Sequence, residues 1–258
     1  MIVTTSRRHA EQLYDEALSF SKKLNRPFIK RDHHSIKQMI ARYNEDVFVV
    51  SKEKLSLYSK HGGAPFFYHP NAAMPRGKFF LRSGHDPLIE AAQLKEGMTF
   101  LDATLGLAAD SLIAKLAVKE SGRVVGVEAH EGIATIVEHG LKTWNEGDER
   151  IIEAMRAIEV VCADHLTYLR SLPDKSFDVV YFDPLFEEAI LDSSGIEALR
   201  SLAIDDDLSV EAIEEAKRVA RKRVVLKDHY KSSRFQAFRF QVIKRSNAAF
   251  YYGFIEVG

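Results

Sequence analysis

The sequence predicts an α/β protein whose main part is a parallel sheet covered by helices on both faces. From residue 83 onward, short apolar runs alternate with segments of helical periodicity. The apolar runs are continuous rather than alternating, as in Asp178–Phe182, which indicates strands buried on both faces. The 258 residues suit one large domain, or one domain plus a small extension.

The first 82 residues predict a small α+β unit. We expect strands at Ile2–Thr5, Phe28–Lys30, Val47–Ser51 and Lys54–Ser59. We expect helices at Arg8–Leu24 and from a Ser35 cap to Tyr43. Residues 60–84 are punctuated by Pro and Gly and predict a loop-rich connection. The predicted domains are therefore residues 1–82 and residues 83–258.

The rest of the chain alternates strands and helices. The expected strands are Thr99–Ala103, Arg123–Glu128, Glu159–Cys162, Asp178–Phe182, Arg223–Lys227, Phe240–Lys244 and Tyr251–Val257. The expected helices are Asp86–Leu94, Asp110–Glu120, Ile133–Asn145, Leu166–Leu172 and Val210–Arg221. Ligands of such sheets bind beyond the carboxyl ends of the strands, which is where we look for a site.

Charge is distributed unevenly along the chain. The net charge is −1, but residues 1–82 carry 15 basic and 7 acidic side chains, whereas the remainder carries 21 and 30. A basic N-terminal part on an acidic body predicts contact with a polyanion, and a solvated basic face is the alternative.

The sequence contains no sign of a membrane segment or a metal site. No stretch approaches the roughly 20 apolar residues of a membrane span, and no apolar run of signal-peptide length opens the chain. With Cys162 as the single cysteine, we expect a cytoplasmic protein. We expect no metal, because the candidate histidines lack ligand spacing with cysteine or acid clusters; they are His33, His34, His61 and His69. The oligomeric state stays open.

Three candidate sites follow successive strands. In F-L-D-A-T-L-G-L-A-A-D, Asp102 ends a strand and Gly106 permits a tight turn and close approach of a ligand. Glu128 ends the next strand, 22 residues after Gly106, where an acid can accept from both ribose hydroxyls of a nucleoside. Asp164 follows the third strand and can accept from an adenine amino group or cap the next helix. Each pattern also has a purely structural interpretation.

The fourth site favours the functional interpretation. The strand F-D-V-V-Y-F runs into D-P-L-F, so that Asp183 offers an acceptor, Pro184 fixes the backbone and Phe186 offers a stacking face. Asp-Pro is also a common turn. Its place at the end of the fourth strand, after three sites in order, points to chemistry. Lys227 and the residues after it, as far as Tyr230, follow the fifth strand. They either line the mouth of the substrate site or form a surface loop.

These residues resemble the class I S-adenosylmethionine-dependent methyltransferases. The resemblance implies a Rossmann-like seven-stranded methyltransferase sheet and S-adenosylmethionine as the cofactor. The cofactor-binding residues that it implies, with their neighbours, are Asp102, Thr104, Gly106, Asp110, Glu128, Ala129, Asp164 and His165. D-P-L-F is similar to the [D/N/S]-P-P-[Y/F/W] motif of enzymes that methylate exocyclic or amide nitrogens, which implies catalytic roles for Asp183, Pro184 and Phe186.

Two motifs are similar to a narrower family. D-A-T-x-G-L-x-x-D and Y-x-D-P-x-F resemble the bacterial enzymes that methylate the guanine amino group (N2) of small-subunit ribosomal RNA. The resemblance implies RNA as the partner, docked through the basic N-terminal part. The sequence departs from the family at Ala108, where glycine is usual, at Ala109, often arginine, and at Leu185.

Two other functions remain open. The same fold can methylate a protein or a small molecule, or the protein can be a non-catalytic RNA-binding relative, which Ala108 would favour. A nicotinamide site is excluded, because Thr104-x-Gly106-x-Ala108 lacks the G-x-G-x-x-G pattern.

Overall fold

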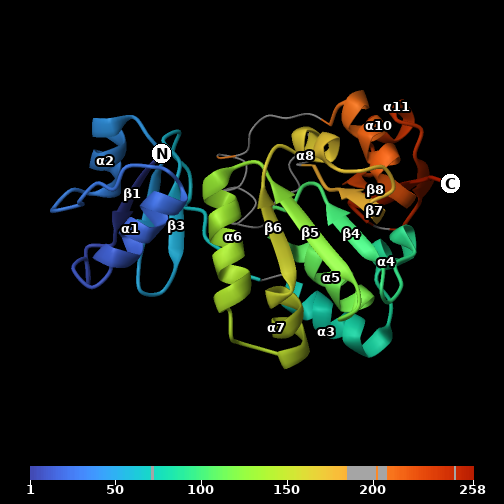
Figure 1. Cartoon of the computed structure of the whole chain (residues 1–258), viewed down its shortest axis with the longest axis horizontal. Helices are drawn as coiled ribbons and strands as arrows, with labels where there is room; N and C mark the ends of the chain where they lie inside the picture. The colour runs from blue at the N-terminus through green and yellow to red at the C-terminus, as the bar shows by residue number, and fades with distance from the viewer. Residues whose placement is uncertain (71–72, 185–201, 203–207, 247) are drawn as a thin grey trace.

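A computed structural model describes residues 1–70, 73–184, 202, 208–246 and 248–258 (Figure 1). Its N-terminal unit holds a three-stranded sheet of β1 (Ile2–Thr5), β2 (Val47–Val50) and β3 (Leu55–Tyr58). β1 is parallel to β2, and β2 is antiparallel to β3. Two helices, α1 (Tyr14–Lys23) and α2 (Ile36–Tyr43), accompany this sheet.

Local sequence explains the ends of the two N-terminal helices. Ser35 and Gln38 form a reciprocal capping box at the start of α2, as expected for Ser35. The prediction that a helix starts at Arg8 is wrong: α1 begins at Tyr14, and His9 has a φ of 60°, in the left-handed region that interrupts a right-handed helix. Likewise Phe28 forms only a single bridge to Val3 rather than a strand.

The larger unit is built on a seven-stranded sheet, as predicted. Its order is β6-β5-β4-β7-β8-β10-β9, and β10 is antiparallel to both of its neighbours. The strands are β4 (Thr99–Asp102), β5 (Arg123–Glu128), β6 (Ile158–Cys162), β7 (Phe177–Phe182), β8 (Ala220–His229), β9 (Gln241–Ile243) and β10 (Phe250–Glu256). β4 to β8 are mutually parallel, so their carboxyl ends share one edge.

Helices cover both faces of this sheet. They are α3 (Ala73–Ser83), α4 (Pro87–Ala92), α5 (Ala109–Val118), α6 (Glu131–Thr143), α7 (Glu149–Arg156), α8 (His165–Ser171), α10 (Val210–Val219) and α11 (Arg234–Ala237). α4 to α7 share a core with Phe100 and Val124 on one face, whereas α8 and α10 pack with Leu101 and Val125 on the other. This alternation along the strands is why their apolar runs are continuous.

Helix α3 replaces part of the loop predicted for residues 60–84. Pro75 lies in its first turn, where a missing N–H costs no hydrogen bond. Gly77 lets α3 approach α7, because a Cβ there would lie 3.1 Å from Ile151 Cδ1. α3 therefore packs with the larger unit, and the division at residue 82 stays a prediction.

The N-terminal unit is anchored on α6. A Cβ on Gly132 would lie 2.9 Å from Leu57 Cδ2 of β3, and one on Gly140 would lie 2.2 Å from the Tyr68 ring. Two ion pairs of 2.6 Å, from Lys23 to Glu138 and from Arg26 to Glu131, add to this contact. α6 starts just after Glu128, so the small unit is fixed beside the second predicted site.

Candidate active site

The four predicted acids all follow parallel strands at the same edge of the sheet. Asp102 ends β4 and Glu128 ends β5, while Asp164 follows β6 and Asp183 follows β7. β4 lies between β5 and β7, so the turns after these strands are neighbours. This edge is where a doubly covered parallel sheet binds its ligands.

The turn after β4 is braced from within by Asp102. One carboxylate oxygen accepts the Thr104 N–H at 3.1 Å, and the other accepts the Ser111 hydroxyl of α5 at 2.6 Å. Asp102 is 1% exposed, and burial raises its pKa to about 7. Both oxygens have donors within the protein, so Asp102 shapes the turn, and its assignment to cofactor binding stays a prediction.

The same turn explains the glycine preference noted in the sequence. Gly106 has a φ of 49°, and Ala108, at the start of α5, has a φ of 61°. Ala108 adopts the left-handed conformation at a cost of about 1 kcal/mol that glycine would not bear. The departure at this position is therefore tolerated by the fold with a modest strain.

Gly126 of β5 packs directly against Leu105 in the turn after β4. A Cβ on Gly126 would lie 2.2 Å from Leu105 Cδ1, directly before Gly106. We expect Gly126→Ala to lower the free energy of unfolding by about 1–3 kcal/mol, the usual cost of overpacking, and to weaken cofactor binding by moving the turn. Denaturant melts and calorimetric titration measure both effects.

Gly140→Ala is the matched control for this prediction. Its Cβ would meet the Tyr68 ring equally closely, but on α6, away from the turn. It should reduce stability without reducing cofactor affinity. Cofactor affinity that is the same in both variants would show that Leu105 does not position the site.

Glu128 and Asp164 present oriented carboxylates at the edge. Glu128 accepts the His130 N–H at 2.9 Å and faces the N–H groups of Gly106 and Ala129, while burial raises its pKa. Asp164 caps α8 by accepting the Thr167 N–H at 2.7 Å, so the capping interpretation is correct. Its other oxygen lies 3.8 Å from Nδ1 of His165, a ring that lies edge-on to Phe182 at 6.0 Å.

Asp183 is tied to the first turn and to a lysine. Its N–H donates to Thr104 Oγ1 at 2.6 Å, which joins the end of β7 to the turn after β4. Its Oδ2 lies 2.6 Å from Nζ of Lys227, on β8. Pro184 is half-buried beside it, whereas Leu185 and Phe186 lie outside the described residues.

A chain of charges links Asp183 to the start of the larger unit. Lys227 Nζ also lies 3.0 Å from Asp110 Oδ2, and the other Asp110 oxygen lies 2.5 Å from Arg76 of α3. The Tyr181 hydroxyl donates to Asp110 at 3.0 Å. Arg76 makes two bonds to Asp86, at 2.7 and 2.9 Å. Asp110 is thus fully bonded inside the protein, on the side of the turn away from Glu128.

Lys227 contacts both Asp110 and Asp183, yet the pKa values of these two carboxyls are shifted in opposite directions. Burial would raise the pKa of Asp110, but Lys227 and Arg76 together hold it well below its usual range. Burial and the neighbouring Asp110 raise the pKa of Asp183 to about 7, against the opposing effect of Lys227. Asp183 is therefore the acid of the pair that can change protonation near neutral pH.

The sequence did not identify Arg76 as a site residue, and for Lys227 it left two interpretations open, the substrate mouth or a surface loop. Lys227 follows V-V-L in a buried strand, and a buried ammonium needs a carboxylate partner. A lysine in an apolar strand was therefore the feature of the sequence that could have identified Lys227 as the partner of a buried carboxylate. β8 continues through His229, so Lys227 lies within the strand and not in a loop after it.

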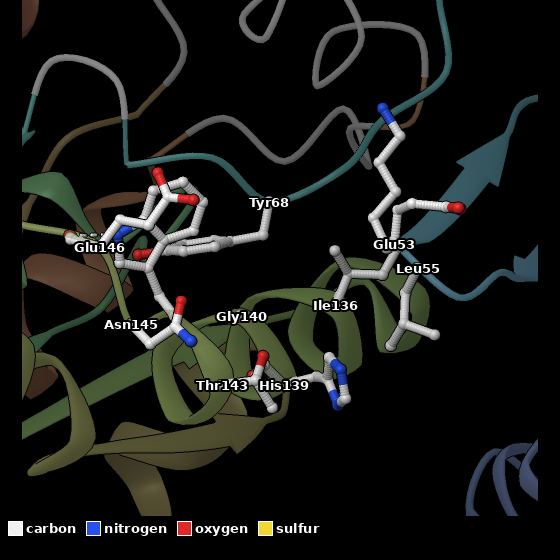
Figure 2. Close-up of a pocket in the computed structure, with 11 residues that line it drawn as sticks. Glu53, Leu55, Tyr68, Ile136, His139, Gly140, Thr143, Asn145 and Glu146 are labelled. Carbon is white, nitrogen blue, oxygen red and sulfur yellow. Dashed lines mark hydrogen bonds between the residues drawn. The ribbon is translucent and has the colours of Figure 1, made fainter.

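A pocket of about 230 Å³ lies elsewhere, between the β2–β3 turn, Tyr68 and α6 (Figure 2). Its α6 residues lie in the middle and second half of the helix, from Ile136 to Thr143. α6 starts beside the end of β5 and runs back along the sheet, so this pocket lies away from the edge that carries Asp183.

Comparisons with known proteins agree with this geometry. Residues 34–247 match the model of a family described as putative SAM-dependent methyltransferases, where SAM is S-adenosylmethionine. The chain belongs to this family. It is also 47% identical over 255 residues to the uncharacterized protein YpiP of Bacillus subtilis, covering 99% of each chain.

One further relative of this methyltransferase and one solved structure have more informative names. Ribosomal RNA small subunit methyltransferase J of Acinetobacter baumannii is 32% identical over 155 residues, which are 54% of each protein. The chain thus spans about half the length of that relative. The crystal structure of the SAM-dependent methyltransferase NGO1261 from Neisseria gonorrhoeae aligns over 100% of this chain and 96% of its own, with a TM-score of 0.64 and 14% identity, and so shows a shared fold.

S-adenosylmethionine is the cofactor of this methyltransferase, and the residues at the edge suit it. A nucleoside offers hydroxyl and amino donors, and Glu128 and Asp164 are oriented acceptors after adjacent strands. The Gly106 turn leaves backbone near any ligand without a side chain between them. Among the described residues, no group of three His, Cys, Asp or Glu side chains could hold a metal, and no helix there is long and apolar enough to cross a bilayer.

Proposed function

We propose that this methyltransferase modifies an exocyclic amino nitrogen of an RNA base, with ribosomal RNA as the expected substrate. The observation that carries the proposal is the position of Asp183. Its backbone is bonded to Thr104 in the cofactor turn, and its carboxylate is held by Lys227. The lone pair of an exocyclic amine is delocalised into the ring of the base, so the amine is a poor nucleophile. A fixed acceptor of its N–H bonds, beside the turn after β4 that is expected to hold the cofactor, would counter this.

The chemistry proposed for Asp183 is acceptance of N–H bonds during attack. With its protons bonded to the Asp183 carboxylate and to nearby carbonyls, the nitrogen can become pyramidal and release its lone pair. When bound, the cofactor supplies an electrophilic methyl group. The proton lost by the nitrogen passes to Asp183, whose pKa of about 7 suits it to take up and release a proton near neutral pH.

Access to the base sets further requirements. The base must be unstacked or already single-stranded to reach the end of β7. Phe186 is expected to stack on it, a role that lies outside the described residues. The relative named as a ribosomal RNA methyltransferase supports an RNA substrate, although the chain spans only about half of it. A protein or small-molecule substrate is the alternative.

The class of substrate is tested by methyl transfer to fractionated cell extract. The protein is incubated with tritiated S-adenosylmethionine and extract from cells that lack its gene. We expect label in the RNA fraction, and much less in RNA from normal cells, because those sites are already methylated. Label confined to protein or to small molecules would overturn the proposal and leave the cofactor assignment standing.

The role of Glu128 can be measured without a substrate. We expect Glu128→Ala to weaken binding of S-adenosylmethionine and of its demethylated product by about 1–3 kcal/mol, the cost of removing the acceptor of buried hydroxyls. Calorimetric titration gives this value directly. The matched control is Glu159→Ala, an exposed acid on β6 that pairs with Arg123 and should bind both ligands normally. Equal affinities in all three proteins would contradict the assignment.

The basic N-terminal unit is proposed to help dock RNA. Some basic residues of this unit are engaged internally: Lys23 pairs with Glu138, and Arg31 donates to the His34 carbonyl. Lys30 lies 3.9 Å from Asp32, but both of these side chains are at the surface, and Lys22 is exposed as well. A cleaner test reverses the exposed Lys22, Lys30 and Lys37 to glutamate.

We expect this triple reversal to weaken RNA binding and to flatten its dependence on salt, because fewer counterions are released. Cofactor affinity should not change. Fluorescence anisotropy of labelled RNA over a range of salt concentrations measures the RNA affinity and its dependence on salt. An unchanged affinity with an unchanged salt slope would exclude this face from RNA binding.

A further inference from the structure

A second basic segment is hidden in the acidic part of the chain. Residues 221–258 carry 9 Lys and Arg side chains and 2 acidic ones, whereas residues 83–220 carry 12 and 28. Averaging over the whole C-terminal part conceals this contrast. The segment includes β8, α11, β9 and β10, which form the side of the sheet farthest in strand order from β6.

Strand direction brings part of this charge to the edge that carries Asp183. β8 and β9 are both antiparallel to β10, so they run the same way and end at the same edge. Lys244 and Arg245 follow β9 there, and Tyr230 and Lys231 follow β8. The Tyr230 N–H donates to the Ala249 carbonyl at 3.2 Å, which holds these two chain segments together.

Aromatic rings and cations alternate on this surface. Tyr230 is 44% exposed, and its ring centroid lies 6.1 Å from that of Tyr251. Lys231 Nζ lies 5.4 Å from the centroid of the Tyr230 ring, and the Arg245 guanidinium lies 5.4 Å from that of Phe250. We call this surface the β8–β10 ledge; it consists of Tyr230, Lys231, Lys244, Arg245, Phe250 and Tyr251.

The ledge begins beside the candidate catalytic carboxylate. Lys227 Nζ lies 5.0 Å from the centroid of the Phe250 ring and 2.6 Å from Asp183 Oδ2. One lysine thus contacts both the acceptor and the first ring of the ledge. The basic N-terminal unit lies at the other side of the sheet, next to α6 (Figure 1).

We propose that the β8–β10 ledge binds the unpaired RNA strand that flanks the target base. This inference rests on the proposed RNA substrate and assigns a part of it to a particular surface. Exposed rings stack on bases of any sequence, and the interleaved cations bind the backbone phosphates. An acidic protein would be held by the charges but would gain little from Tyr230, so the ring distinguishes the two partners.

The experiment measures binding of a fluorescent 15-nucleotide single-stranded RNA of mixed sequence to the full chain. One variant neutralises the charges: Lys231→Gln, Lys244→Gln and Arg245→Gln. A second variant is Tyr230→Ala alone. The matched control neutralises three lysines that precede strands and so lie at the opposite edge: Lys95→Gln, Lys119→Gln and Lys175→Gln. Melting curves and cofactor titration show whether each variant is folded.

We expect the ledge triple variant to bind the RNA at least tenfold more weakly, with a salt slope lower by about two, since each phosphate contact contributes about 0.7 for single strands. Tyr230→Ala should lose on the order of tenfold, the scale of one stacked base. The control triple and cofactor affinity should match the wild type. The wild type should bind the single strand more tightly than its duplex.

Three results would contradict the proposal that the β8–β10 ledge binds RNA. Wild-type affinity in the triple variant would exclude it, and so would loss of binding to the same extent in the control triple. Tyr230→Ala binding normally, with polyglutamate competing as well as RNA, would indicate an acidic protein partner. The proposed function fails separately: ledge-dependent RNA binding without methyl transfer to any RNA would keep the ledge and remove the enzyme's RNA substrate.

Discussion

An Asp183→Ala protein is expected to fold and to bind S-adenosylmethionine normally, and to methylate its substrate at least on the order of a hundredfold more slowly. This is the scale for removing one preorganised electrostatic group. The fold should survive because Lys227 keeps a second partner, Asp110, at 3.0 Å. The loss should fall on turnover more than on substrate affinity, because the carboxylate acts mainly as the amine attacks.

A single-turnover assay beside a melting curve separates this role from a structural one. If Asp183-Pro184 is only a turn, the variant should melt earlier and lose cofactor binding and activity together. Asp183→Asn is the matched control, since it keeps the shape and one acceptor but not the charge. An Asp183→Ala protein with the wild-type rate would remove the mechanism.

The same carboxylate sets the expected pH dependence. Asp183 has a pKa raised to about 7 and must be ionised to accept N–H bonds fully. The wild-type rate should therefore rise as pH increases through about 7 and level off above it. The groups that face Asp183 are Lys227, which opposes the raised pKa, and Asp110, which adds to it. Asp183→Asn should abolish this rise.

Lys227→Met is expected to have the largest effect on stability. Lys227 is 14% exposed and is shared by two buried carboxylates, so its removal leaves negative charge without its partner. Breaking a buried pair in this way costs about 3–5 kcal/mol of unfolding free energy. Arg76 and Tyr181 still bind Asp110, which favours the lower end of that range. Urea unfolding measures the change.

The pH dependence of this loss has a definite sign. Asp183, whose raised pKa of about 7 Lys227 opposes, is ionised at pH 8 and protonated at pH 4, so Lys227 stabilises its charge only at the higher pH. The deficit of Lys227→Met should therefore be larger at pH 8 than at pH 4. Lys227→Arg keeps the charge and should recover part of the stability.

An exposed lysine of the same strand serves as the control. Lys222 pairs with Asp178 at 3.1 Å, but it lies at the surface, and Lys222→Met should cost no more than about 1 kcal/mol. If Lys227→Met were equally mild, the charge chain from Arg76 to Asp183 would have no energetic role. Activity should also fall with Lys227→Met, and the rise of the rate with pH should move to higher pH.

Strand sequences predicted the sheet well because its central strands β4, β5 and β7 are buried on both faces. Continuous apolar runs such as Asp178–Phe182 have few alternatives, and the bounds predicted for Arg123–Glu128 match β5. Helices α3 and α7 were not predicted. In α3, Pro75 and Gly77 are typical of a loop, but here they occupy a first turn and a close helix contact. That distinction depends on the packing partner, which local sequence does not reveal.

The candidate site was predictable only where it follows strands. Asp183 and Glu128 each end a strand, and parallel strands bring their ends together. Arg76 and Lys227 are 34 and 117 residues from Asp110 in sequence, so only the folded chain brings them to it. The burial of two motif residues was not predictable from the sequence either: Asp102 and Asp110 accept hydrogen bonds from donors inside the protein. Their assignment to cofactor binding stays a prediction.

Mass spectrometry of the methylated nucleoside shows which atom of the RNA receives the methyl group, which we propose to be an amino nitrogen of a base. Small-subunit ribosomal RNA from cells lacking the gene is treated with the protein and deuterated S-adenosylmethionine, digested to nucleosides and fragmented. We expect a single labelled nucleoside with the methyl group on the exocyclic nitrogen of its base, and far less of it when Asp183→Ala protein is used. Label on a ribose oxygen or a ring carbon, or no label in RNA, would contradict the proposal.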